Sequence, residues 1–111
     1  MNLIQLDGVE RLKVKSVTDT NDFKNAIIAS FKRGNSQQID VVGAGALNVA
    51  IKAVASASSE LQKGPLGIKD IIVSPSWFAA QGETADHEVA QISGIRLETF
   101  YVMREQDINH L

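Results

Sequence analysis

The chain has 111 residues, of which 44% are hydrophobic and 22% charged, and it contains no cysteine. These values fit one globular domain with a single core, and they exclude disulfides, thiolate metal sites and cysteine nucleophiles. The net charge of −2 hides an asymmetry, because residues 1–69 hold nine Lys/Arg against six Asp/Glu, whereas residues 70–111 hold two against seven. A protein dedicated to coating nucleic acid is normally far more basic.

The first strand and the first helix are predicted within residues 12–33. In Leu12–Val17, apolar side chains alternate with Lys13 and Lys15, which is typical of a half-buried strand. Residues 18–22 are rich in the types that cap helix N-termini, and the helix that follows is expected to end at Gly34. The apolar positions of this helix have helical spacing and are Phe23, Ala26, Ile27 and Phe31.

An apolar strand that runs into two glycines is the most informative pattern of the chain. We predict a strand over residues 38–42, a tight turn at Gly43–Gly45 and an alanine-rich helix over residues 46–61. Such a junction presents free backbone N–H groups and the positive end of a helix dipole. An anion, including a nucleic-acid phosphate, can bind at such a place.

The second half of the chain predicts two further strands. The almost continuously apolar segment 68–74 predicts a central strand that Pro75 ends, followed by a long arm over 75–94 and a last strand over 95–104. The order β-α-β-α-β-β predicts an α/β fold of the two-layer α+β type, with a four-stranded mixed sheet and two helices. We expect one domain over residues 12–105, a tail or an extra edge strand at 1–11, and a flexible tail at 106–111.

The run Gly43-Ala44-Gly45-Ala46-Leu47-Asn48 and the alanine-rich helix after it resemble the stage V sporulation protein S family. The resemblance continues through Asp70–Pro75 and Phe78 and covers most of residues 12–105. That family is similar in fold to the Alba chromatin proteins and to the C-terminal domain of bacterial translation initiation factor three. The fold that the resemblance implies agrees with the order of elements read from the hydrophobic pattern.

The resemblance also implies function. It implies a small cytoplasmic regulatory protein linked to sporulation, which binds DNA or RNA weakly and forms a homodimer or a higher oligomer. Alba-like proteins bind nucleic acid through basic residues before the second helix and through a basic hairpin arm. This chain departs from that pattern, because the Gly43–Gly45 turn has no Lys or Arg and the arm carries Glu83, Asp86 and Glu88. These departures remove contacts that supply most non-specific affinity.

Two groups of residues are candidates for binding an anion or a nucleic acid. The first group is the glycine turn together with Asn48 and Lys52, which lie one helical turn apart on the second helix. The alternative interpretation is that the glycines only permit a tight turn and close packing. The second group is a basic patch, whose alternative is a solvated face. The first group is Gly43, Ala44, Gly45, Asn48 and Lys52; the second is Lys13 and Lys15, with Lys24, Lys32 and Arg33 beside them.

Small and aromatic residues are candidates for subunit contacts. Ala46, Ala50 and Ala53 form a small-residue stripe on the second helix, which packs either on its own sheet or against a second subunit. Trp77 and Phe78 follow Pro75 on the arm, where they stack on bases, cover the core or contact a partner.

No pattern for catalysis or for a cofactor is found in the sequence. Asp86-His87-Glu88 has no second histidine near it, so we expect a surface loop there rather than a metal site. No Ser-His-Asp order and no complete nucleotide-binding motif occurs. No apolar run approaches the roughly 20 residues that span a bilayer, so we expect no membrane contact and a cytoplasmic location.

Three functions from different classes therefore stay open. The first is a non-enzymatic regulator that binds nucleic acid through the glycine turn and the basic face. The second is an oligomeric interaction module that contacts a protein through the acidic arm and Trp77-Phe78. The third is a sensor of a small anionic ligand at the second helix, with Lys52 as the counter-charge.

Overall fold

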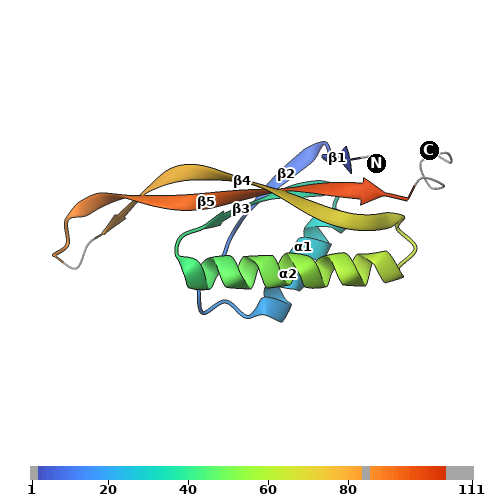
Figure 1. Cartoon of the computed structure of the whole chain (residues 1–111), viewed down its shortest axis with the longest axis horizontal. Coiled ribbons are helices and arrows are strands. Elements are labelled where there is room, and N and C mark those ends of the chain that lie inside the picture. The colour runs from blue at the N-terminus through green and yellow to red at the C-terminus, as the bar shows by residue number, and fades with distance from the viewer. Residues whose placement is uncertain (1–2, 84–85, 105–111) are drawn as a thin grey trace.

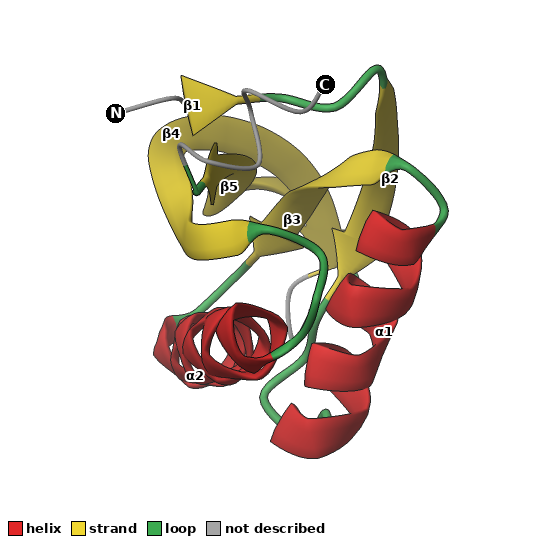
Figure 2. Ribbon diagram, turned by 90° about the vertical axis from the view of Figure 1, so that its right-hand side faces the viewer, coloured by secondary structure: helices red, strands yellow, loops and turns green. Residues whose placement is uncertain are grey.

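A computed structural model describes residues 3–83 and 86–104, which form two helices packed on one face of a five-stranded mixed sheet (Figures 1 and 2). The predicted two-layer class is confirmed, with one strand more than the four expected. The predicted tail at 106–111 lies outside the described residues. In chain order the elements are β1 (Leu3–Ile4), β2 (Gly8–Lys13), α1 (Thr20–Lys32), β3 (Asn35–Val41), α2 (Ala44–Lys63), β4 (Ile68–Glu83) and β5 (Val89–Met103).

Strand β5 is the centre of the sheet. It pairs antiparallel with β4 along one edge, and with β3 and β1 along the other. Strand β2 then adds parallel to β3, which requires the crossover that α1 provides. Both helices cover the same face of the sheet, and no helix of the described residues covers the opposite face (Figure 2).

The predicted first strand is wrong in its second half. Strand β2 starts at Gly8 and ends at Lys13, because the chain then turns: the Lys15 N–H donates to Thr18 Oγ1 at 2.9 Å and the Thr18 N–H to the Lys15 carbonyl at 3.0 Å. The predicted capping region is confirmed, since Asp19 caps α1 and accepts the Asp22 N–H at 2.9 Å. The hydroxyl group of Thr18 thus stabilises the turn after β2, and the carboxylate of Asp19 starts helix α1.

The prediction that Pro75 ends the third strand is also wrong. Strand β4 continues through Pro75 to Glu83, paired with β5 from Ile68 opposite Met103 to Glu83 opposite Val89. Proline is tolerated there because β4 is an edge strand among the described elements, so one side of its backbone needs no partner strand. The predicted arm is therefore a regular two-stranded ribbon that extends past the start of α2 (Figure 1). It makes the molecule 57 Å long but only 23 by 21 Å across.

The core lies between the helices and the sheet. Helix α2 contributes a stripe of alanines that are at most 2% exposed, and these let α2 approach α1 and the sheet closely. Large side chains from the strands fill the remaining space, and the Phe31 and Tyr101 rings lie 4.6 Å apart between centroids. The alanines are Ala46, Ala50, Ala53 and Ala57.

A fully buried glutamine ties the sheet to α1. The Gln37 amide nitrogen donates to Ser30 Oγ at 3.0 Å, and its oxygen accepts the hydroxyls of Thr99 at 2.8 Å and of Tyr101. All four residues are 0% exposed, so each bond replaces water that the core excludes. Burial raises the pKa of Tyr101 to about 12, although its hydrogen bonds to Gln37 and Thr99 act in the opposite direction.

This pKa predicts how stability changes at high pH. The folded protein keeps the Tyr101 proton up to pH of about 12, whereas the unfolded chain loses it near pH 10. The free energy of unfolding therefore does not depend on this titration below about pH 10, and it falls by about 3 kcal/mol in total as the pH rises from about 10 through 12, because burial disfavours the phenolate. Urea unfolding of wild type and Tyr101→Phe between pH 9 and 12 measures it. The variant should be less stable by about 1 kcal/mol at neutral pH and should lose less stability at high pH. Parallel pH curves for the two proteins would contradict the prediction.

Candidate functional site

A groove lies beside the base of the ribbon, where β2 ends, and has a volume of about 700 Å³. Four cationic side chains and one carboxylate line it together with apolar side chains from three parts of the chain. The charged residues are Arg11, Lys13, Lys15, Arg96 and Asp40; the others are Val14, Ser16, Val17, Val42, Phe78, Ala79 and Ala80.

Three of the cations come from β2 and the turn after it. Arg11 and Lys13 are two residues apart on β2, so they lie on the same face of the sheet, the one that the helices leave uncovered. Lys15 follows in the turn that Thr18 closes. Within the described part of the chain, none of Arg11, Lys13 and Lys15 has an ion-pair partner. The groove therefore has an excess of uncompensated positive charge.

The fourth cation is held in place by its neighbours. Arg96 Nε donates to Asp40 Oδ1 at 2.9 Å and Nη2 donates to Oδ2 at 3.3 Å, across the β3–β5 pairing. Its guanidinium also lies 5.2 Å from the centroid of the Phe78 ring. The hydrogen bond to Asp40 raises the pKa of Arg96. Arg96 is thus a positioned cation whose charge Asp40 already balances in part.

The glycine turn lies against the turn that carries Lys15. Gly43 caps α2 with φ of 91°, a conformation that L side chains rarely adopt, and it makes no side-chain capping bond. A Cβ added at Gly45 would be 2.7 Å from Ser16 Cβ, so the two segments touch there. The first turn of α2 contains no acidic residue. The positive end of the α2 dipole therefore adjoins the basic groove.

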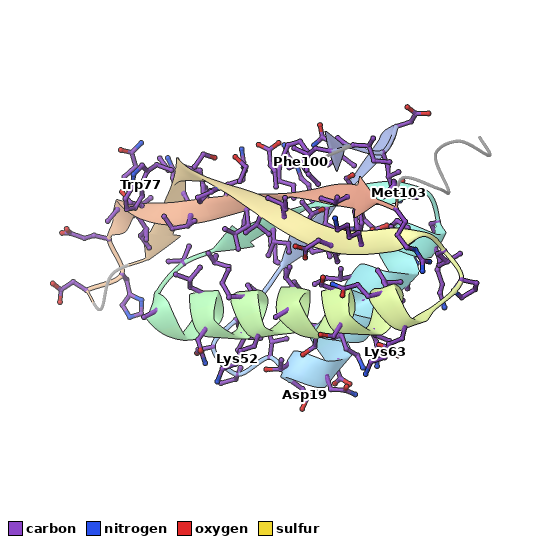
Figure 3. The ribbon with its side chains drawn as sticks, turned by 45° about the vertical axis from the view of Figure 1, so that its right-hand side comes forward. Asp19, Lys52, Lys63, Trp77, Phe100 and Met103 are labelled. Carbon is purple, nitrogen blue, oxygen red and sulfur yellow. The ribbon has the colours of Figure 1, made fainter. Side chains whose placement is uncertain are left out.

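The structure divides the predicted binding residues into two sets. Lys13 and Lys15 line the groove, and Gly43, Ala44 and Gly45 lie exposed beside its Ser16 wall. Asn48 and Lys52 are exposed on α2 but do not line the groove, and Lys52 lies on the side of the helix away from the sheet (Figure 3).

The wider basic patch is not one surface. Lys24 Nζ of α1 pairs with Glu60 of α2 at 3.2 Å. Arg33 Nη2 pairs with Glu10 at 2.6 Å, and this bond lowers the pKa of Glu10. Neither Lys24 nor Arg33 lines the groove. Their charges are engaged in fixing α1 to α2 and to β2.

The residues predicted at an interface also lie in different environments. Ala46, Ala50 and Ala53 pack inside the chain's own fold, so the close approach they allow is to the sheet and α1. Trp77 is 78% exposed on the ribbon and does not cover the core (Figure 3). Phe78 is half-buried and covers Gly94, whose added Cβ would lie 2.4 Å from the ring.

The sequence analysis does not predict two residues of the groove, Arg11 and Arg96. Arg11 has a usable signal, since it precedes Lys13 by two and shares its face in any strand that includes both. A strand that is predicted to start at Leu12 excludes Arg11, which is why the prediction does not include it. Arg96 has no such signal, because only the β3–β5 register brings it to Asp40.

Among the described residues, no group of three or more His, Cys, Asp or Glu could hold a metal ion. No helix in the described ranges is long and apolar enough to cross a membrane.

Comparison with known families identifies the class of protein. The model of the Stage V sporulation protein S family matches residues 10–98, which is most of the chain and includes most of β2, all of β3 and β4, both helices and most of β5. The chain belongs to the Stage V sporulation protein S family, and this membership supports a regulatory protein of sporulation. A comparison with curated proteins finds no match.

The contact between Gly45 and Ser16 predicts a pairwise coupling. Gly45→Ala adds a Cβ that Ser16 Cβ blocks, and that atom cannot rotate away because it is bonded to the backbone. In a Ser16→Gly background the same change should instead stabilise α2, by about 1 kcal/mol, through helix propensity. Urea unfolding should show that the effect of Gly45→Ala differs by at least about 1 kcal/mol between the two backgrounds. Gly64→Ala is the control, since its Cβ would meet only the Leu61 carbonyl at 3.7 Å. An equal effect in both backgrounds would contradict the contact.

Proposed function

We propose that this protein is a non-enzymatic regulator that binds the phosphate backbone of DNA or RNA in the groove at the end of β2. The observation that carries the proposal is the set Arg11, Lys13 and Lys15, three cations with no ion-pair partner among the described residues, gathered in one groove. Phosphate contacts of this kind release counterions and supply most of the affinity of a protein that does not read sequence.

The surroundings of the groove support an anion as the ligand. The α2 N-terminus adjoins it through Gly45 and Ser16, and its dipole adds to the positive potential. Arg96 is pre-positioned by Asp40, so a phosphate that approaches it meets a guanidinium that has already lost much of its rotational freedom.

The number of cations predicts weak binding. Three uncompensated charges neutralise about three phosphates, which gives a slope of log K against log salt of about −3 for duplex DNA. The overall charge of −2 opposes any longer contact with a polyanion. A regulator with such a site binds briefly or with help from another contact, rather than covering nucleic acid continuously.

A small anionic ligand is the second candidate, because the groove has the volume of a small-molecule site and apolar walls at Val17, Val42 and Phe78. A rise in melting temperature with a small organic phosphate, in a protein that binds no oligonucleotide, would favour this second function.

The proposal predicts a salt-dependent affinity that specific lysines control. Binding of labelled single- and double-stranded DNA and RNA should be measured by anisotropy between about 25 and 250 mM salt. Lys13→Gln/Lys15→Gln should weaken binding to duplex DNA at low salt and reduce the size of the slope by about 2. These two side chains lie in the groove, so each lost charge removes one released counterion.

The matched control is Lys63→Gln/Lys69→Gln, which removes the same charge from two exposed lysines outside the groove. It should keep most of the affinity. Equal losses in the two double variants would show general attraction without a site, and no binding at the lowest salt would refute the function.

A further inference from the structure

The groove at the end of β2 spans four neighbouring strands of the sheet. Lys13 of β2 lies opposite Asp40 of β3, and Asp40 lies opposite Arg96 of β5. Phe78 lies on β4, two residues beyond Ser76, the partner of Arg96. The cations that have no ion-pair partner among the described residues are therefore at the β2 side of the groove, and the aromatic ring is at the β4 side.

Arg96 presents a flat cationic surface between these two sides. Its Nε and Nη2 atoms both donate to the Asp40 carboxylate, and two bonds to one carboxylate fix the plane of a guanidinium. The guanidinium lies over the Phe78 ring, with Cζ 5.2 Å from the ring centroid. The Arg96 side chain is nevertheless 29% exposed and lines the groove, so a ligand in the groove can contact the guanidinium.

The β4 side of the groove suits a nucleobase better than a phosphate. Asp40 repels an anion and already balances part of the charge of Arg96, whereas a base is neutral. Bases stack on guanidinium planes and on aromatic rings, and their faces also contact apolar side chains such as Val42. Phe78 lines the groove and Trp77 does not, so Phe78 is the aromatic residue that can support such a base.

The shape of the site favours a single strand over a duplex. The groove has a volume of about 700 Å³, which is the size of a site for one small molecule or one nucleotide. The bases of a duplex are stacked on each other and cannot enter it. The ribbon beside the groove adds no further contact to a duplex, because residues 70–95 contain no Lys or Arg and include Asp86 and Glu88.

We propose that the groove binds an unpaired nucleotide of a single-stranded nucleic acid, an inference that rests on the proposed function. Arg11, Lys13 and Lys15 contact the phosphates, and one base stacks on the Arg96 guanidinium above Phe78. Arg11 and Lys13 are two residues apart, about 7 Å along β2, and Lys15 follows in the turn. Cations spread in this way match the successive phosphates of a strand better than the phosphate of a free nucleotide.

The central test compares two strands that differ only in their bases. Anisotropy at about 25 mM salt measures the binding of a labelled single-stranded DNA of about 10 nucleotides, and of a strand of equal length with abasic central nucleotides. Both strands carry the same phosphates, so wild type should bind the natural strand about tenfold more tightly only if a base is contacted. A blunt duplex of the same sequence should also bind more weakly than the natural strand, because its bases are paired.

Arg96→Lys separates stacking from charge. It keeps the positive charge but loses the planar group, so it should remove most of the preference for the natural strand and leave the salt slope unchanged. Phe78→Leu removes the ring beneath the guanidinium and should also reduce the preference severalfold. Arg11→Lys is the matched control, because it makes the same substitution in the same groove at an arginine for which the described residues show no ring contact and no ion pair. It should keep the preference.

The outcomes separate this inference from the proposed function. If wild type binds the natural and the abasic strand equally and Lys13→Gln/Lys15→Gln weakens both, the base contact is refuted while phosphate binding stands. Equal losses of the preference in Arg96→Lys and Arg11→Lys would also refute the stacking. A free nucleoside monophosphate that displaces the strand at a concentration near the dissociation constant of the strand would overturn the assignment to a strand. No binding of any strand at the lowest salt would refute both proposals.

Discussion

The pairing of β4 with β5 is the constraint on which the rest of the structure depends. It runs from Ile68–Met103 at one end to Glu83–Val89 at the other, while β3 and β1 use only the inner part of the second β5 edge. One half of the hairpin therefore belongs to the sheet that the two helices cover on one face, and the other half is a ribbon with no helix beneath it (Figure 1). The same two strands contribute to the core, to one wall of the groove and to the whole of the two-stranded ribbon.

The groove exists because two strands end and one helix begins next to the same part of the β4–β5 hairpin. Strand β2 ends at Lys13, β3 ends at Val41, and α2 begins at Ala44. Gly43 allows the left-handed backbone that the last change needs, and Gly45 allows the α2 N-terminus to touch Ser16. Among the described residues, Lys13 at the end of β2 and Lys15 after it have no ion-pair partner, whereas Lys24 of α1 pairs with Glu60 and Arg33 at its C-terminal end pairs with Glu10. The cations that hold α1 in place therefore lie in ion pairs, and the cations that line the groove can contact a ligand.

The sequence predicted the order of the long strands and the two helices, because hydrophobic periodicity acts locally. The glycine junction before α2 was predicted at the right place, but α2 begins at Ala44 rather than at residue 46, so Gly45 lies in its first turn. It placed the first strand too late, since Lys13 and Lys15 alternate with apolar residues although only Lys13 lies in β2. It ended β4 at Pro75, because whether a proline is tolerated depends on the strand being at an edge, which is a property of the whole sheet. Lys13 and Lys15 of the groove could be predicted, because their signal is the alternation of neighbouring residues. Arg96 could not be predicted, because the pairing of β5 with β3 brings it into the groove. Lys52 was predicted as part of the same site, but helix α2 turns it away from the sheet (Figure 3).

The most direct test of the account is an amide chemical-shift titration of the protein with a short oligonucleotide at about 25 mM salt. The account predicts shifts confined to residues 11–17, to 42–46 at the start of α2, and to Arg96 with its strand neighbours. Shifts centred on Asn48 and Lys52 along the exposed side of α2, or no shifts at any ratio, would contradict the assignment of the groove as the binding site.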